Sequence, residues 1–298
     1  MKLRDRHIIY LILLVALAVP KLFDLELPSV RFKNAQTAFD VVEQIKADGS
    51  ALVFVALDFG PNTVGENRPQ AETLIEHLMI RGVPFILSSQ YSQAKSLLEE
   101  IPQKVADRLN VLQASNQLGE TGATKNKRTY GKDWVNIGFR PGAATFLQQL
   151  AKSKSLINDI KSDARGNNLK DLPIFEKANT FKQISHVVQI TGLTGTLNNF
   201  MEFFTSPEHR PKFIHGCTSI VIPEAYIYLD SKQLNGLLEG VAGAAWYSEL
   251  LHKRFGLGDT ENTSAIFNTM ISVGHLVLIF FVALGNLLFY LKRKQGAK

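Results

Sequence analysis

Several residues whose types suit ligand chemistry follow directly after apolar runs of the sequence. Asp58 comes after the run at 52–57, and Ser89 comes just beyond the run at 83–87. In open parallel sheets, ligands bind beyond the carboxyl ends of the strands, so both side chains are candidates for a binding site. Asp58 could hold a cation or a ribose hydroxyl group, or it could cap the turn that contains Gly60.

Two turns have a composition that suits anions. Residues 140–142 and residues 192–196 each lead from an apolar run into a predicted helix. Free N–H groups at helix N-termini attract phosphate and carboxylate groups. Neither turn matches a dinucleotide fingerprint or a Walker A motif, and glycine with a threonine cap also suits any tight strand-to-helix turn. The candidate anion-binding residues are Arg140, Gly142, Thr194, Gly195 and Thr196.

Cys217 is the single cysteine, so no intramolecular disulfide can form. With His215 nearby, it could be the nucleophile of an amide or ester hydrolase. The segment lacks the glycine that nucleophile elbows place two residues after the nucleophile, and cysteine is among the most buried residue types, so a packing role is preferred. The histidines show no metal-ligand spacing, and neither a metal nor a cofactor is predicted.

The elements that would position these residues alternate between strand and helix. Predicted strands cover residues 52–57, 83–87, 134–139, 186–191 and 213–218. Predicted helices cover residues 35–46, 70–81, 93–109, 143–152, 196–204 and 223–251. This alternation predicts an α/β fold, a doubly wound, mainly parallel five-stranded sheet of Rossmann or flavodoxin type.

Within the last predicted helix, small residues recur every four positions, at Gly236, Gly240 and Ala244. Glycine lowers helix stability, so we expect a close backbone approach to compensate for it. The partner surface is the domain's own sheet or another subunit.

Residues 271–291 contain no charged side chain over 21 positions. At about 1.5 Å per residue they form roughly 31 Å of helix, the thickness of the hydrocarbon core of a bilayer. A transmembrane helix is therefore predicted over residues 265–291. The shorter run at 8–19 is either a cleavable signal peptide or, as we prefer, an uncleaved anchor within residues 1–23.

Net charge is concentrated at the two ends of the chain. Residues 1–20 and the tail at 292–298 carry the whole excess of +6, while residues 21–264 hold 26 basic and 26 acidic side chains. A neutral central region argues against a nucleic-acid-binding protein. Positive flanks mark the cytoplasmic side of membrane segments, so both termini are predicted to be cytoplasmic and the domain at 24–264 extracytoplasmic.

One side of the predicted membrane helix is polar. Asn268, Ser272, His275, Asn286 and Tyr290 lie near one meridian of the helix. Polar groups that face lipid are costly, so this side should contact the N-terminal helix or a neighbouring subunit. Alternatively, only His275 and Asn286 are immersed and the others lie at the membrane interfaces.

Residues 130–142 (YGKDWVNIGFRPG) and 233–245 (QLNGLLEGVAGAA) resemble segments of a family of prokaryotic membrane-anchored α/β proteins. The resemblance implies an exported domain with its anchors and carries no activity.

Three functions remain open from the sequence. The preferred one is a membrane-tethered structural or interaction protein that assembles with itself or with another membrane protein. The second is an extracytoplasmic module that binds a small anion or a nucleotide-like ligand, with the turns at 140–142 and 192–196 and Asp58 forming one site. The third is the hydrolase that depends on Cys217.

Overall fold

The computed structural model describes residues 3–118, 126–257 and 262–296 of the 298-residue chain. The chain divides into two compact units. One unit comprises Val30–Thr260, and the other joins the two ends of the chain, Met1–Ser29 and Glu261–Lys298.

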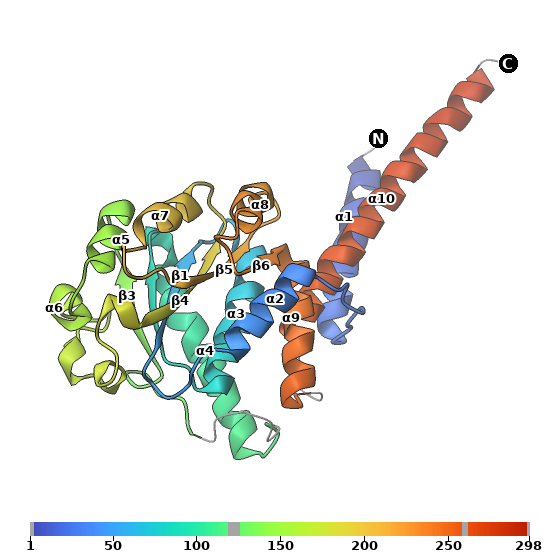
Figure 1. Ribbon diagram of the computed structural model, residues 1–298. Helices are drawn as coiled ribbons and strands as arrows, with labels where there is room; N and C mark the ends of the chain where they lie inside the picture. Colours follow the sequence, from blue (N-terminus) through green and yellow to red (C-terminus); the bar gives the residue numbers. More distant parts are fainter. Residues whose placement is uncertain (1–2, 119–125, 258–261, 297–298) are drawn as a thin grey trace. The chain divides into compact units, whose positions relative to one another are not determined.

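The unit Val30–Thr260 is built around a sheet of six parallel strands (Figure 1). Along the chain these are β1 (Leu52–Asp58), β2 (Phe85–Ser89), β3 (Trp134–Phe139), β4 (Ile184–Thr191), β5 (Lys212–Cys217) and β6 (Gly236–Glu239). Their order is β3-β2-β1-β4-β5-β6, so the direction of winding reverses between β1 and β4. This is the Rossmann-type order, which confirms the predicted α/β class. The predicted number of five strands is wrong, because β6 adds a sixth.

Side chains alternate between the two faces of the sheet, and each face has its own core. The first face contacts α2 (Lys33–Glu43), α3 (Val64–Arg81), α4 (Lys95–Ala114) and α9 (Gly240–Phe255). The second face contacts α5 (Ala143–Ala151), α6 (Leu156–Ile160), α7 (Thr196–Phe203) and α8 (Ile222–Asp230). Figure 1 shows these two helical layers with the strands between them.

β6 contradicts the predicted helix over residues 223–251. Gly236–Glu239 pairs with β5 as a strand, and α9 begins only at Gly240. Asn235 fixes this pairing, since its backbone N–H donates to the Phe213 carbonyl (2.7 Å) and its Oδ1 accepts from the Phe213 N–H (2.8 Å). Gly236, Gly240 and Ala244 therefore do not form one small-residue helix face.

The expected close backbone approach is nevertheless present, inside the domain. A Cβ atom on Gly236 would lie 2.5 Å from the Cα of Ala38 on α2. Gly240 adopts φ +60°, a left-handed conformation that favours glycine, and Ala244 is buried in the first core. The backbone of β6 thus packs directly against α2.

In the other unit, α1 (Leu3–Leu22) packs against α10 (Thr263–Gly296). A Cβ atom on Gly274 would lie 2.8 Å from Leu17 Cδ2, so glycine permits this contact. The Leu27 N–H donates to Thr269 Oγ1 at 2.8 Å. Leu17 contacts Gly274, whereas Leu27, ten residues later, bonds to Thr269, five residues earlier. The two segments therefore run antiparallel.

α10 is the one helix among residues 3–118, 126–257 and 262–296 whose length and composition would allow it to cross a membrane. α1 does not meet these criteria of length and composition, so the predicted N-terminal span within residues 1–23 is not shown. Charged residues near both ends of α1 leave only residues 7–20 uncharged, fewer than the roughly 20 that span a bilayer.

The tight approach of β6 to α2 predicts the effect of a single methyl group. Gly236→Ala should lower the free energy of unfolding by about 1–3 kcal/mol, because the new atom overlaps the backbone of Ala38. Urea denaturation of the intact protein in detergent measures this.

Gly65→Ala is the matched control, since its Cβ would meet nothing within 4 Å and it lies in α3. It should be neutral or stabilise by up to about 1 kcal/mol. Equal stability of the two variants would contradict the packing argument.

Candidate functional site

The carboxyl end of β1 holds a buried carboxylate. Asp58 is fully buried and accepts hydrogen bonds from the Gln90 N–H (2.7 Å), Gln189 Nε2 (2.9 Å) and Ser89 Oγ (3.2 Å). Burial raises the pKa of Asp58, and these three hydrogen bonds oppose the increase. Asp58 and Ser89 therefore meet, but the carboxylate ties the ends of β1, β2 and β4 together inside the fold.

Arg140, predicted to share a ligand with Asp58, lines a separate cavity. Its backbone N–H donates to the Ser89 carbonyl (2.9 Å), which keeps the end of β3 in register with β2. Its Nη2 donates to the Ser162 carbonyl at 3.3 Å, and its guanidinium lies 5.8 Å from the ring centroid of Phe146. Gly142 adopts φ +70° and serves as the N-cap residue of α5.

The turn at 192–196 already holds a carboxylate from the same chain. The Gly195 N–H lies 3.2 Å from both carboxylate oxygens of Glu224. Thr196 Oγ1 donates to the Leu193 carbonyl at 3.1 Å, while Thr194 is exposed. Glu224 of α8 thus lies at the N-terminus of α7, where a bound anion was predicted.

A buried polar row on the second face of the sheet escaped sequence analysis. Gln189 of β4 and His215 of β5 are partners in register, and both are fully buried. Gln189 Oε1 and both ring nitrogens of His215 have no hydrogen-bond partner. Burial lowers the pKa of His215 to about 3, so its imidazole is neutral at pH 7. The signal in the sequence is a polar residue directly beside apolar residues in each strand, Gln189 before Ile190 and His215 after Ile214.

Cys217 lies at the carboxyl end of β5 and is fully buried. Burial, together with Glu239 and Glu224, raises the pKa of its thiol to about 12. A nucleophilic cysteine needs a thiolate and access to substrate. The environment of Cys217 opposes both, which favours the packing role.

A second buried cluster joins three helices of the first face. The His77 ring lies between Glu43 Oε1 (2.9 Å from Nε2) and the Tyr247 hydroxyl (2.7 Å from Nδ1). The hydrogen bond from His77 is the largest cause that lowers the pKa of Glu43 to about 2, whereas burial lowers the pKa of His77. We interpret His77 as a neutral histidine that connects α2, α3 and α9 through these two hydrogen bonds.

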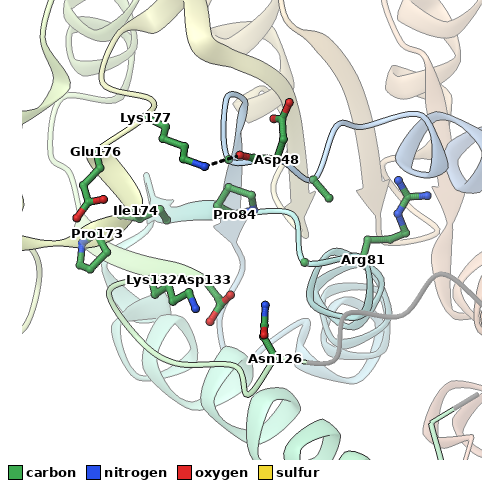
Figure 2. Close-up of a pocket in the computed structure, with 13 residues that line it drawn as sticks. Asp48, Arg81, Pro84, Asn126, Lys132, Asp133, Pro173, Ile174, Glu176 and Lys177 are labelled. Carbon is green, nitrogen blue, oxygen red and sulfur yellow. Dashed lines mark hydrogen bonds between the residues drawn. The ribbon is translucent and has the colours of Figure 1, made fainter. Parts of the chain in front are cut away.

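Figure 2 shows a cavity of about 370 Å³ at the amino end of the sheet. Its charged lining residues are Asp48, Arg81, Lys132, Asp133, Glu176 and Lys177. Arg81 donates to the carbonyls of Glu43 and Ile45, and Lys177 Nζ donates to the Asp48 carbonyl at 3.2 Å. Basic and acidic groups balance in this lining, which leaves no net charge to attract an ion.

A larger cavity of about 510 Å³ lies at the carboxyl end of β3 and includes Arg140. None of the other predicted ligand residues lies among its described lining residues. The predicted site therefore separates into three places: the buried Asp58–Ser89 pair, the turn filled by Glu224, and the Arg140 cavity.

No family model, curated protein or solved structure matches the chain. Among the described residues, no group of three or more His, Cys, Asp or Glu side chains could hold a metal ion. The class of the protein is thus defined by its fold, a six-stranded parallel α/β domain together with one apolar helix that could span a membrane.

The unpartnered ring of His215 predicts a pH dependence of stability. Below its ordinary pKa of about 6.5 the unfolded chain takes up a proton at this position, whereas the folded chain does not until about pH 3. The contribution of His215 to the free energy of unfolding is therefore complete above pH 6.5 and is lost as the pH falls toward 3. Between pH 7 and pH 5 the loss from this residue is about 2 kcal/mol.

His215→Leu should remove this contribution. Urea denaturation of the wild type and the variant at pH 7 and pH 5 measures how much the free energy of unfolding of each protein falls between the two pH values. This fall can be compared even if the variant is less stable at both. An identical fall in the wild type and the variant would show that His215 is not the acid-sensitive group.

Proposed function

We propose that the chain is a membrane-tethered interaction protein whose α/β domain assembles with a second copy or with another membrane protein. The single observation that carries this is the exposed polar side of α10. Its large apolar side chains, among them Ile279, Phe280 and Leu287, are exposed, which favours a lipid environment. His275 and Asn286 are exposed on the same helix.

Packing of α1 supports a partner outside the chain. α1 covers the side of α10 that contains Gly274, and it leaves His275 and Asn286 exposed. Asn268 and Ser272, nearer the start of α10, are half-buried. A polar group in lipid gains by forming a hydrogen bond with another helix, so a further helix against His275 and Asn286 satisfies both.

The proposed orientation follows from the charges at the ends. α1 exposes Tyr10, Leu11 and Leu14, which suits an uncleaved anchor at residues 1–23 that lies beside α10 in the bilayer. Positive residues flank both apolar segments, which supports cytoplasmic termini and an extracytoplasmic domain at 24–264. No catalytic role is part of this proposal.

Assembly through the polar side of α10 predicts that apolar substitutions on this side weaken association. The double variant His275→Leu, Asn286→Leu should weaken association by roughly 3- to 30-fold for each interhelical hydrogen bond lost, given about 0.6–2 kcal/mol per bond. Energy transfer between labelled copies in lipid vesicles, and copurification in mild detergent, measure this. Phe280→Ala is the control, because Phe280 is exposed and position 280 lies at least about 120° around the helix from His275, from Asn286 and from Gly274 on the side that α1 covers. A lone monomer without a copurifying partner would contradict the proposal.

Topology predicts which parts a protease can reach. Protease added to sealed spheroplasts should remove the domain at 24–264, while a tag fused after the basic tail at 292–298 stays protected. Membranes turned inside out should show the reverse pattern. Protection of the domain in spheroplasts would refute the extracytoplasmic placement without bearing on assembly.

A further inference from the structure

The cavity at the carboxyl end of β3 has the size and place of a ligand site. Its volume is about 510 Å³, within the range of about 300–1,000 Å³ that holds small molecules. Open parallel sheets bind ligands beyond the carboxyl ends of their strands; this cavity lies there, at the edge strand β3 rather than at the switch point between β1 and β4. The lining comes from three segments, the end of β3, the first turns of α4 and the loop at 162–165.

One wall of the cavity is fixed by its own contacts. Arg165 pairs with Glu99 of α4, and its guanidinium lies 3.5 Å from the centroid of the Tyr130 ring. The Tyr130 hydroxyl donates to Asp163 Oδ2 at 2.8 Å. Asp163 also accepts from the backbone N–H groups of Arg165 (2.9 Å) and Asn167 (2.8 Å). Both carboxylates of the cavity are thus engaged within this wall.

Arg140 stands apart from that network. Its Nε is buried without a hydrogen-bond partner, and it forms no ion pair with a carboxylate in the described part of the chain. Its side chain is half-buried, and burial lowers the pKa of the guanidinium, which still remains charged at pH 7. A charge with an unused donor in such a place is costly unless a partner binds there.

The rest of the lining matches an organic anion. Lys95 adds a second positive charge at the exposed rim. Ile137, Phe139 and Ala164 contribute apolar surface. The cavity is larger than an inorganic ion needs, so the anionic group is expected to belong to a larger molecule.

We propose that this cavity binds a small organic molecule through a carboxylate or phosphate group held by Arg140. Arginine suits this role because its planar donors match the oxygens of both groups. The proposal goes beyond assembly in the membrane and does not require it, so either can fail alone.

Binding is tested with the intact protein in detergent at low ionic strength. The probes are citrate, adenosine monophosphate and inorganic phosphate, and adenosine is the neutral counterpart of the nucleotide. We expect citrate or adenosine monophosphate to raise the melting temperature, with a binding isotherm by calorimetry, while adenosine has no effect. A flat response to all three anions, or an equal response to adenosine, overturns the proposal.

Arg140→Gln should weaken binding of the responding probe by at least about tenfold, and Arg140→Lys should weaken it less, because lysine keeps the charge without the planar donors. Arg210→Gln is the matched control, since Arg210 is an exposed arginine bonded to Gln233, neither of which lines the cavity. Without probe, Arg140→Gln should be at least as stable as the wild type. Unchanged affinity in Arg140→Gln, or loss of affinity equally in Arg210→Gln, refutes the assignment of Arg140.

Discussion

The fold depends on the burial of β1 on both faces of the sheet. A strand in this position has no access to water, so every polar atom on it needs a partner in the protein. Backbone groups find theirs in β2 and β4. The one acidic side chain on β1, Asp58, finds its partners in Ser89 at the end of β2, in Gln90 directly after it and in Gln189 of β4. The burial that makes β1 apolar therefore also makes Asp58 a structural junction between β1, β2 and β4.

Sequence patterns located five of the six strands to within two residues, because parallel strands buried on both faces are continuous apolar runs. They failed at β6 for a physical reason. A four-residue strand is too short to show a recognisable alternation of side chains. In addition, Gly236 and Gly240 are four positions apart, which is the spacing of residues on one face of a helix. Its pairing with β5 is a contact between distant parts of the chain, so no local preference reveals it. Asp230, Ser231 and Asn235, which are weak helix formers, are the residues nearby that could have indicated a boundary.

The grouping of the candidate residues depends on contacts that sequence patterns do not reveal. Asp58 and Ser89 meet because β1 and β2 are adjacent parallel strands that end at one edge of the sheet. Arg140 and the turn at 192–196 lie apart from this pair, because strand order does not determine where a long side chain points or which internal group reaches a helix N-terminus. Glu224 fills one such N-terminus from a helix that sequence patterns had merged with its successor. The contact between His77 and Glu43 was missed because the two residues are 34 positions apart in the sequence.

The antiparallel contact between α1 and α10 has a consequence for how the protein is made. The hydrogen bond from Leu27 to Thr269 joins residues 242 positions apart. Synthesis at about 5–20 residues per second separates their appearance by roughly 12–50 seconds. During that interval the first helix leaves the ribosome without its intramolecular partner, and the whole α/β domain is translated before the pair can form. A nascent chain that stops early would therefore expose the surface of α1 around Leu17, which α10 covers in the finished protein.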